Sequence, residues 1–283
     1  MKLLSKLVTD RTVSVLLAGK PPMQANDTHP NFQRILDALD AGDYDALPDL
    51  FSVANAVRKY ADGLEVRGGA VFLDGEALAG PIVQRIIDNA GAGRKNDWLV
   101  NFQRSLARNP SRRIREQLYA FIEKSTNIGI NDAGNIVAYK IVRQYGTIAP
   151  GADAPTTFVS LHDNRTRHDL GAVVSMPRHD VDDDPTRTCS HGLHACSENY
   201  LNSFGGGSND WVVAVEIKPE NVVSIPTDYD FAKMRCCEYK VIAVLGRQAD
   251  IVKSPPNLDD YDYGDDNWVT EEWEDEVDDG YSR

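Results

Sequence analysis

The chain concentrates its chemically reactive side chains in its C-terminal half. Five of the six histidines lie within His162–His194, and all four cysteines lie within Cys189–Cys237. The densest stretch, Thr186–Tyr200, holds two cysteines and two histidines within eight positions around a glycine. Any catalytic or metal-binding chemistry is therefore expected in this half.

Metal binding is the first chemistry that this stretch suggests. Its candidate ligands are Cys189, His191, His194 and Cys196. These are residue types that zinc prefers, and on an extended strand the first two share one face. A turn at Gly192-Leu193 can then bring the second pair beside them. Structural zinc sites, however, usually take cysteine pairs two residues apart, separated by a longer loop. We therefore expect separate, satisfied side chains, with no metal and no cofactor, and keep a closed zinc site as the alternative.

The cysteine count also indicates the redox compartment. Four cysteines in 283 residues do not make a secreted disulfide framework, and the neighbours Cys236 and Cys237 cannot easily bridge each other. A reducing cytosol fits better, with this pair as small buried hydrophobic residues. The length allows one large domain or two ordinary ones.

No segment predicts a membrane span. Residues 1–20 resemble a signal peptide in their lysines and leucines, but Asp10 and Arg11 interrupt the apolar run. The β-branched run Thr12–Leu17 predicts a strand instead. Residues 1–28 are accordingly expected to be one strand followed by a linker.

The acidity of the chain lies in its last 30 residues. Residues 254–283 hold twelve Asp or Glu and one basic residue, a net charge of −11, which leaves −2 of the total −13 for residues 1–253. Such a block repels itself and stays solvated, so we predict a disordered tail. Its tyrosines and tryptophans leave open a role in docking on a basic partner. Direct contact with nucleic acid is not expected, because the chain would repel phosphate.

Residues 29–127 predict a mainly helical region with one small hairpin. Apolar residues at helical spacing follow Thr28 and Leu47, and three more helices are expected within residues 81–124. Two alternating runs around Gly68-Gly69 predict the hairpin Leu64–Leu73. The arginines near the last two helices are expected to be solvated, with a basic docking patch as the alternative. They are Arg104, Arg108, Arg112, Arg113 and Arg115.

Residues 128–253 predict a β-rich domain. A turn at Asp132–Asn135 separates short β-runs, and further strands are expected at residues 172–176, 211–217, 221–225 and 239–245. Ser197–Phe204 is the one expected helix. Helices first and strands afterwards indicate an α+β fold with a mixed or antiparallel sheet.

Two motifs in this domain resemble ADP-ribosyltransferase folds. Gly192–Cys196 followed by Ser197–Tyr200 resembles the strand that runs into a helix in those enzymes, and Cys237–Val241 resembles the late strand with the catalytic glutamate. The resemblance implies His194 and Glu238 as catalytic candidates. Glu238 would hydrogen-bond a ribose hydroxyl and stabilise the oxocarbenium-like charge as nicotinamide leaves NAD.

The chain departs from that pattern in two ways. His194 stands where a tyrosine is usual, and the histidine or arginine of the first NAD-binding strand has no clear counterpart. Tyr139-Lys140 and Arg143 are the nearest residues. Since a fold does not carry its function with it, a non-catalytic version is the favoured interpretation.

A wider resemblance covers roughly residues 29 to 245. The stretches that carry it are His29–Leu50, Asn135–Arg143, Gly171–Tyr200 and Asp228–Tyr239. Together they resemble the phage rIIB-type proteins, which are described as lysis inhibitors. The resemblance implies an early bacteriophage protein that acts in the host cytoplasm, peripheral to the inner membrane, through an rIIA-type phage partner. It implies an effect on lysis timing or on exclusion by a prophage or host defence. A small-molecule ligand is not expected.

Overall fold

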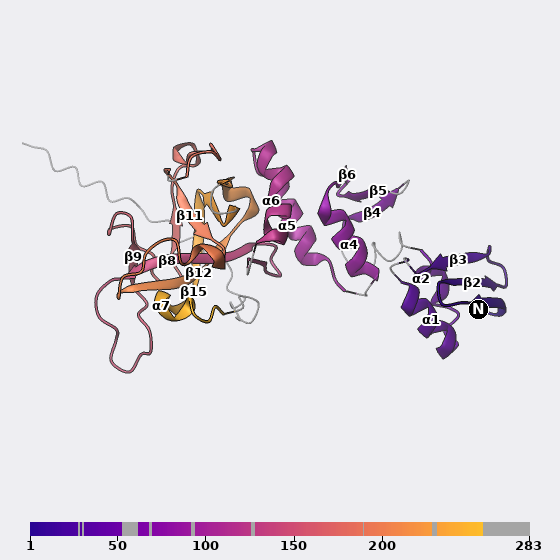
Figure 1. Cartoon of the computed structure of the whole chain (residues 1–283). Helices are drawn as coiled ribbons and strands as arrows, with labels where there is room; N and C mark the ends of the chain where they lie inside the picture. Colours follow the sequence, from indigo (N-terminus) through magenta and orange to yellow (C-terminus); the bar gives the residue numbers. More distant parts are fainter. Residues whose placement is uncertain are drawn as a thin grey trace, which may run out of the picture.

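The computed structural model describes residues 1–27, 29, 31–52, 62–67, 70–91, 94–125, 128–188, 190–227 and 231–256. Within these ranges the elements form three successive groups (Figure 1). A small sheet with two helices comes first, a hairpin with three helices follows, and a large sheet comes last. The predicted α+β class is confirmed.

The first group builds its own core. Strands β1 (Leu3–Val8), β2 (Thr12–Leu17) and β3 (Met23–Asn26) form an antiparallel sheet in that order. On β2, alternate residues Val13, Val15 and Leu17 are buried, as expected for a half-covered sheet. They pack against α1 (Phe32–Ala41) and α2 (Leu47–Leu50).

The strand β3 falls inside the stretch that was expected to be a linker. Its Ala25 is buried beside Val13, whereas Gln24 and Asn26 point outward. Met23 also packs against this core, so the strand does alternate apolar and polar residues, but its four residues are too few to distinguish it from a linker.

The second group matches the predicted helices and hairpin. The hairpin pairs β4 (Leu64–Arg67) with β5 (Ala70–Leu73), and β6 (Glu76–Ala77) extends it. The helices are α4 (Pro81–Gly91), α5 (Asp97–Ala107) and α6 (Arg112–Lys124). Residues 53–61, Gly68 and Gly69 lie outside the described residues.

The third group is an antiparallel sheet with the order β10-β15-β12-β8-β11-β14-β13, and β7 and β9 also pair with β8. The strands at one side and the centre are β10 (Val173–Ser175), β15 (Glu238–Arg247), β12 (Asp210–Ile217) and β8 (Ile136–Gln144). The others are β11 (Leu193–Cys196), β14 (Lys233–Cys236), β13 (Val222–Ser224), β7 (Gly129–Ile130) and β9 (Phe158–Ser160). A short helix, α7 (Gln248–Ile251), follows β15.

Two details of the predicted β-rich domain are wrong. The expected helix Ser197–Phe204 is a 3₁₀ turn at Glu198–Tyr200 followed by turns, because Gln248 Nε2 donates to the carbonyls of Leu201 and Phe204. Strand β14 was not expected, because Lys233 and Arg235 break its apolar pattern. Both are buried all the same, at 2% and 0% exposure.

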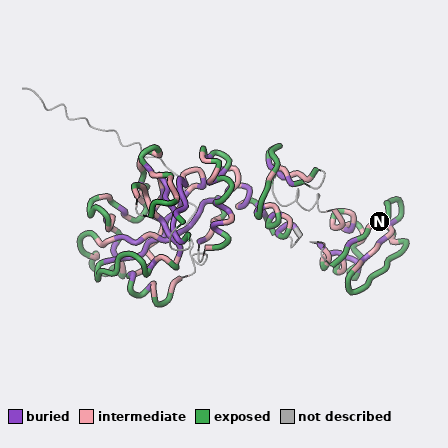
Figure 2. Tube along the Cα trace, turned by 45° about the horizontal axis from the view of Figure 1, so that its top comes forward, coloured by how far each residue is buried: buried purple, intermediate pink, exposed green. Residues whose placement is uncertain are grey.

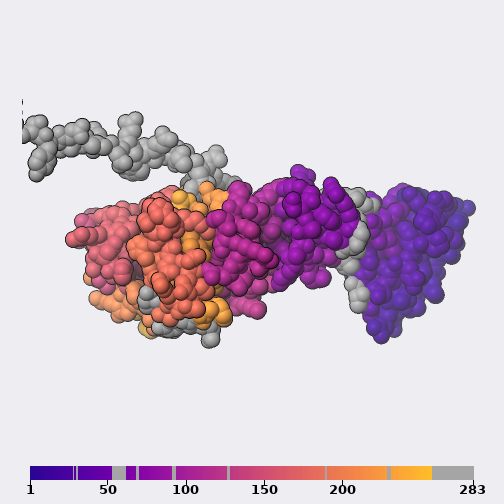
Figure 3. Space-filling model, turned by 90° about the horizontal axis from the view of Figure 1, so that it is seen from above, coloured from indigo at the N-terminus to yellow at the C-terminus, as the bar shows by residue number. Residues whose placement is uncertain are grey.

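The second and third groups share one core. A single cluster of buried apolar residues runs from Leu64 through α4–α6 to Val241 of β15, and buried residues recur along both groups (Figure 2). The turn at Gly134 (φ +80°) lies so close to α5 that a Cβ atom would come 2.2 Å from the Phe102 nitrogen. In the space-filling view α5 and α6 lie directly against the strands (Figure 3).

The arginines of α5 and α6 contribute to this junction. Arg108 pairs with Glu220, and Arg113 donates to the Asp183 carbonyl of the third group. The remaining three contact residues nearer in sequence: Arg104 pairs with Asp74, Arg112 with Glu116, and Arg115 donates to the Asn109 carbonyl. Each of the five arginines therefore makes a polar contact within the chain.

Two predictions are left open by the structure. The acidic tail from residue 257 onward lies outside the described residues. Among the helices that the structure does describe, none is both long and apolar enough to cross a membrane.

Candidate functional site

The large sheet contains a cavity of about 640 Å³. Strand β8 pairs with β11 at Tyr139 and with β9 from Val142 onward. Lys140 and Ile141, between these two pairings, line the cavity. The cavity therefore opens where β8 changes its hydrogen-bonding partner. Residues 160–163 after β9, residues 190–192 and strand β11 form its other walls.

Two lysines line this cavity from different strands. The ammonium of Lys233 donates to the Thr188 carbonyl at 2.7 Å and lies 5.3 Å from the centre of the Tyr200 ring. The ammonium of Lys140 lies 5.9 Å from the centre of the Tyr239 ring. Burial lowers the pKa of Lys140, since desolvation disfavours its charged form.

A buried hydrogen-bond chain forms one wall. His168 Nδ1 lies 3.0 Å from the Thr166 carbonyl, and Nε2 lies 2.7 Å from the Tyr239 hydroxyl. Because a carbonyl can only accept, Nδ1 carries the proton and Nε2 accepts from the tyrosine. Burial, together with the charge of Lys140, lowers the pKa of His168 to about 4. The imidazole is therefore neutral at pH 7.

The predicted catalytic candidate His194 also lines the cavity. Burial lowers its pKa to about 3, with the positive charges of Lys140, Arg235 and Lys233 acting in the same direction. The neighbouring Cys196 is buried, its thiol donates to the Tyr139 carbonyl at 3.5 Å, and burial raises its pKa to about 12. A neutral imidazole and a protonated thiol make neither a general acid nor a reactive nucleophile at pH 7.

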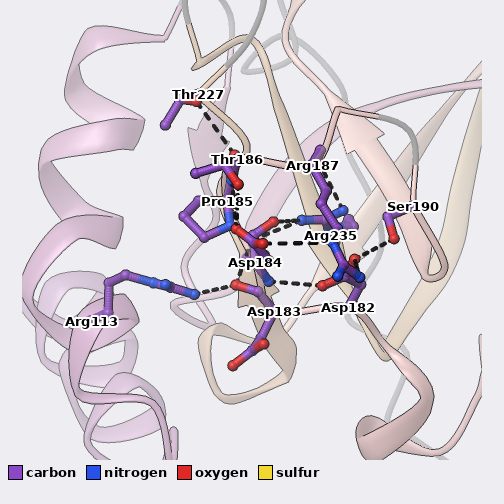
Figure 4. Close-up of polar contacts among 11 residues, drawn as sticks. Arg113, Asp182, Asp183, Asp184, Pro185, Thr186, Arg187, Ser190, Thr227 and Arg235 are labelled. Atoms are coloured by element: carbon purple, nitrogen blue, oxygen red, sulfur yellow. Dashed lines mark hydrogen bonds and ion pairs between the residues drawn. The ribbon is translucent and has the colours of Figure 1, made fainter.

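The loop of residues 182–188 is held around the buried guanidinium of Arg235 (Figure 4). Arg235 donates to the carbonyls of Asp184 and Arg187 and, at 3.2 Å, to the Ser224 hydroxyl. Asp182 accepts from the Ser190 hydroxyl and from the guanidinium of Arg187. These hydrogen bonds lower the pKa of Asp182 to about 2. The loop is thus fixed at both ends.

The end of this loop requires a glycine. Gly192 has φ +143°, and a Cβ atom there would come 2.8 Å from the Val181 side chain. Strand β11 begins at the next residue, so the close approach of Gly192 to Val181 holds the start of the strand that carries His194 against the start of the loop.

Three of the four candidate metal ligands lie in the described part of the chain, and Cys189 lies outside it. His191, His194 and Cys196 all line the cavity, and the Cys196 thiol donates to the Tyr139 carbonyl. Within the described ranges no three histidine, cysteine or acidic side chains come close enough together to hold a metal ion. Cys236 and Cys237 are both buried.

Glu238, the other catalytic candidate, is not in the cavity wall. Its carboxylate accepts from the Asn221 amide at 3.0 Å. The next residue, Tyr239, and the strand partner of Glu238, Ser175, do line the cavity, whereas Glu238 is not among the lining residues. The structure therefore does not bring Glu238 and His194 together around one space.

Comparison with known proteins places this geometry in a family. The family described as "Bacteriophage T4 protein rIIB" matches residues 49–251. Protein rIIB of Enterobacteria phage T4 is 36% identical over 237 residues, which is 83% of this chain and 72% of that protein. The chain belongs to the bacteriophage T4 rIIB family. No solved structure gives a significant match.

The rIIB match contains the whole cavity and the loop around Arg235, which both lie between residues 113 and 241. Most of the N-terminal sheet and its helices lies before residue 49, outside the family match. The large sheet and α4–α6 lie within the family match, and the similarity to T4 rIIB, over 237 residues, extends beyond that match. The likeness to ADP-ribosyltransferase folds stays a prediction, since no finding shows it.

Several site residues of this rIIB-family chain were missed in the sequence. Lys140 and Tyr239 belong to strands that were expected, but nothing in either pattern marks a cavity. Lys233 and Arg235 have a signal that could have been used. Two long cations alternate with Met234 and Cys236, and a buried strand with such cations needs carbonyl acceptors nearby.

Proposed function

We propose that this protein acts in the cytoplasm of the infected cell through protein partners, and that it affects lysis timing or counters exclusion by a prophage or host defence. The observation that carries the proposal is the rIIB family membership, with 36% identity along 83% of the chain. An rIIA-type phage protein is the proposed partner, and the complex is proposed to lie against the inner membrane.

The positions of the two catalytic candidates favour this function over an ADP-ribosyltransferase-like enzyme. That chemistry needs a carboxylate at the place where positive charge develops on the ribose. Glu238 instead accepts a hydrogen bond from Asn221 and is not among the residues that line the cavity. His194, which does line the cavity, cannot replace it, because an imidazole is neutral or positive and supplies no negative charge.

Deleting the gene in the phage that encodes this protein tests the proposal. We expect the deletion phage to lyse its host at a different time, or to fail on a host with an excluding prophage. A plasmid copy of the wild-type gene should restore both properties. Glu238→Gln should restore them equally well, and Arg235→Met should not, because it releases the loop. Unchanged lysis timing and unchanged plating of the deletion phage on both hosts would contradict the proposal.

A further inference from the structure

The two lysines of the cavity differ in how their side chains are held. Lys233 donates to the Thr188 carbonyl and has further contacts. Lys140 lines the cavity and is partly exposed. Within the described part of the chain, the one polar or ring contact of its amine is with the Tyr239 ring, whose centre lies 5.9 Å from the nitrogen. A ligand in the cavity can therefore reach the Lys140 amine without displacing another group.

The surroundings of Lys140 favour the neutral amine over the ammonium. Burial lowers the pKa of Lys140, since desolvation disfavours its charged form. At pH 7 the imidazoles of His168 and His194 are neutral and the Cys196 thiol is protonated. Asp163 is the one carboxylate among the lining residues, and it accepts three hydrogen bonds within its own turn. A larger fraction of Lys140 is therefore neutral at pH 7 than of an exposed lysine.

The other titratable groups near Lys140 come from β14 and β15. Burial raises the pKa of the Cys236 thiol and of the Tyr239 hydroxyl, so both stay uncharged at pH 7. Lys233 and Arg235 are cations, and a positive charge disfavours a second one nearby. These four groups bring no negative charge to Lys140.

A neutral lysine amine is a nucleophile for a carbonyl group. The nitrogen electron pair forms a bond to the carbonyl carbon, and one amine proton moves to the carbonyl oxygen. The carbon–oxygen bond then breaks, and this oxygen leaves as water with the second amine proton. The product is an imine between lysine and ligand, and its formation needs neither an oxidant nor a reductant.

The size and remaining walls of the cavity indicate what kind of carbonyl compound fits. About 640 Å³ is within the range of small-molecule sites. Aromatic and apolar side chains complete the lining, among them Leu161, Leu193, Tyr200 and Phe204. An aldehyde with a flat or apolar body matches both the walls and the amine.

We propose that Lys140 binds a small aldehyde covalently, as an imine, with the apolar or aromatic body of the aldehyde in the cavity. The sequence did not predict a small-molecule ligand. The proposal holds whether or not the protein acts through an rIIA-type partner.

Reductive trapping on the full wild-type chain tests the proposal. The protein is incubated with benzaldehyde and cyanoborohydride, which reduces the imine to a stable benzyl-lysine, and each lysine is read by mass spectrometry. At pH 7, Lys140 should be labelled at least tenfold faster than Lys124, an exposed lysine in the last turn of α6. The ratio of the two rates should grow from pH 9 to pH 7, because an ordinary lysine loses its neutral form below a pKa of about 10.4.

Two comparisons separate binding in the cavity from a merely reactive amine. The rate at Lys140 should saturate with benzaldehyde, and formaldehyde, which lacks an apolar body, should prefer Lys140 less. Ser175 is exposed and lines the cavity, so it lies at the opening. Ser175→Trp should slow benzaldehyde labelling of Lys140 at least fivefold, and Ser5→Trp, the same change at an exposed site on β1, should not.

Labelling of Lys140 no faster than that of Lys124 in the wild-type protein would overturn the proposal. An equal preference for Lys140 with formaldehyde and benzaldehyde would also overturn it, because the cavity would then not recognise the body of the aldehyde. An unchanged rate at Lys140 in a folded Ser175→Trp variant would contradict it in the same way.

Discussion

Burial, more than the neighbouring residues in the sequence, decides the protonation states of the residues that line the cavity. His168 and His194 keep neutral imidazoles because desolvation and the nearby lysines disfavour protonation. The sequence suggested His194 and Glu238 together, and only His194 lines the cavity. The sequence could not separate the two, because it does not show which strand positions border a cavity.

The histidines predict a specific dependence of stability on pH. Both have folded pKa values, about 4 and about 3, below the ordinary 6.5. Between pH 6.5 and 4.5 the unfolded chain therefore binds protons that the folded chain does not. The free energy of unfolding should fall as pH drops, by at most about 1.4 kcal/mol per pH unit for each histidine.

Urea unfolding at pH 6.5, 5.5 and 4.5 measures this dependence. His194→Gln should show a shallower loss than wild type, because one of the two titrating groups is gone. A loss of equal steepness in His194→Gln, or an imidazole of His194 that titrates near pH 6.5 in NMR spectra of the folded protein, would contradict the burial argument.

Glu238→Gln is predicted to be nearly neutral. The amide oxygen of glutamine can still accept the hydrogen bond from Asn221, so the free energy of unfolding should change by less than about 1 kcal/mol. Purified wild-type protein should not consume NAD, as measured by nicotinamide release. Nicotinamide release that disappears in Glu238→Gln would instead establish the enzyme, because transition-state stabilisation needs the charge.

At the scale of elements, the loop of residues 182–188 depends on β14. Its backbone carbonyls are satisfied by Arg235 and Lys233, two cations buried in a strand. The spacing of apolar residues predicted the apolar strands and the amphipathic helices. It did not predict β14, because the buried charges of that strand bind backbone carbonyls of another segment. It did not predict β3, because only Ala25 of that strand is fully buried.

Arg235→Met should be strongly destabilising. It leaves the carbonyls of Asp184 and Arg187 without their donor in a buried position, at a cost of roughly 3–5 kcal/mol. Arg187→Met is the matched control: its side chain is 66% exposed, so the change should cost less than about 1 kcal/mol. Urea unfolding gives both values, and equal small losses would show that Arg235 does not hold the loop.

Among the described residues the N-terminal core and the larger core are separate, and they do not follow the change from helices to strands near residue 127. The N-terminal core joins β1–β3 to α1 and α2. The larger core joins the hairpin and α4–α6 to the sheet. The spacing of apolar residues in the sequence could not show this, because it indicates whether a segment is a helix or a strand and not which segments share a core.

The two cores predict how fragments behave. A fragment of residues 62–256 should fold and melt cooperatively, since it keeps the larger core complete. A fragment of residues 128–256 should aggregate, because it loses α4–α6 and exposes the apolar side chains that they cover. Circular dichroism and thermal melting test both. A stable, cooperatively melting 128–256 fragment would contradict the shared core.

The most direct test of the account is whether this chain binds an rIIA-type protein. The two proteins of the same phage would be purified separately, mixed, and analysed by size-exclusion chromatography with light scattering. The account predicts a stable complex of defined mass, which Glu238→Gln also forms. Two proteins that elute separately at micromolar concentration, with masses equal to those of the components alone, would contradict it.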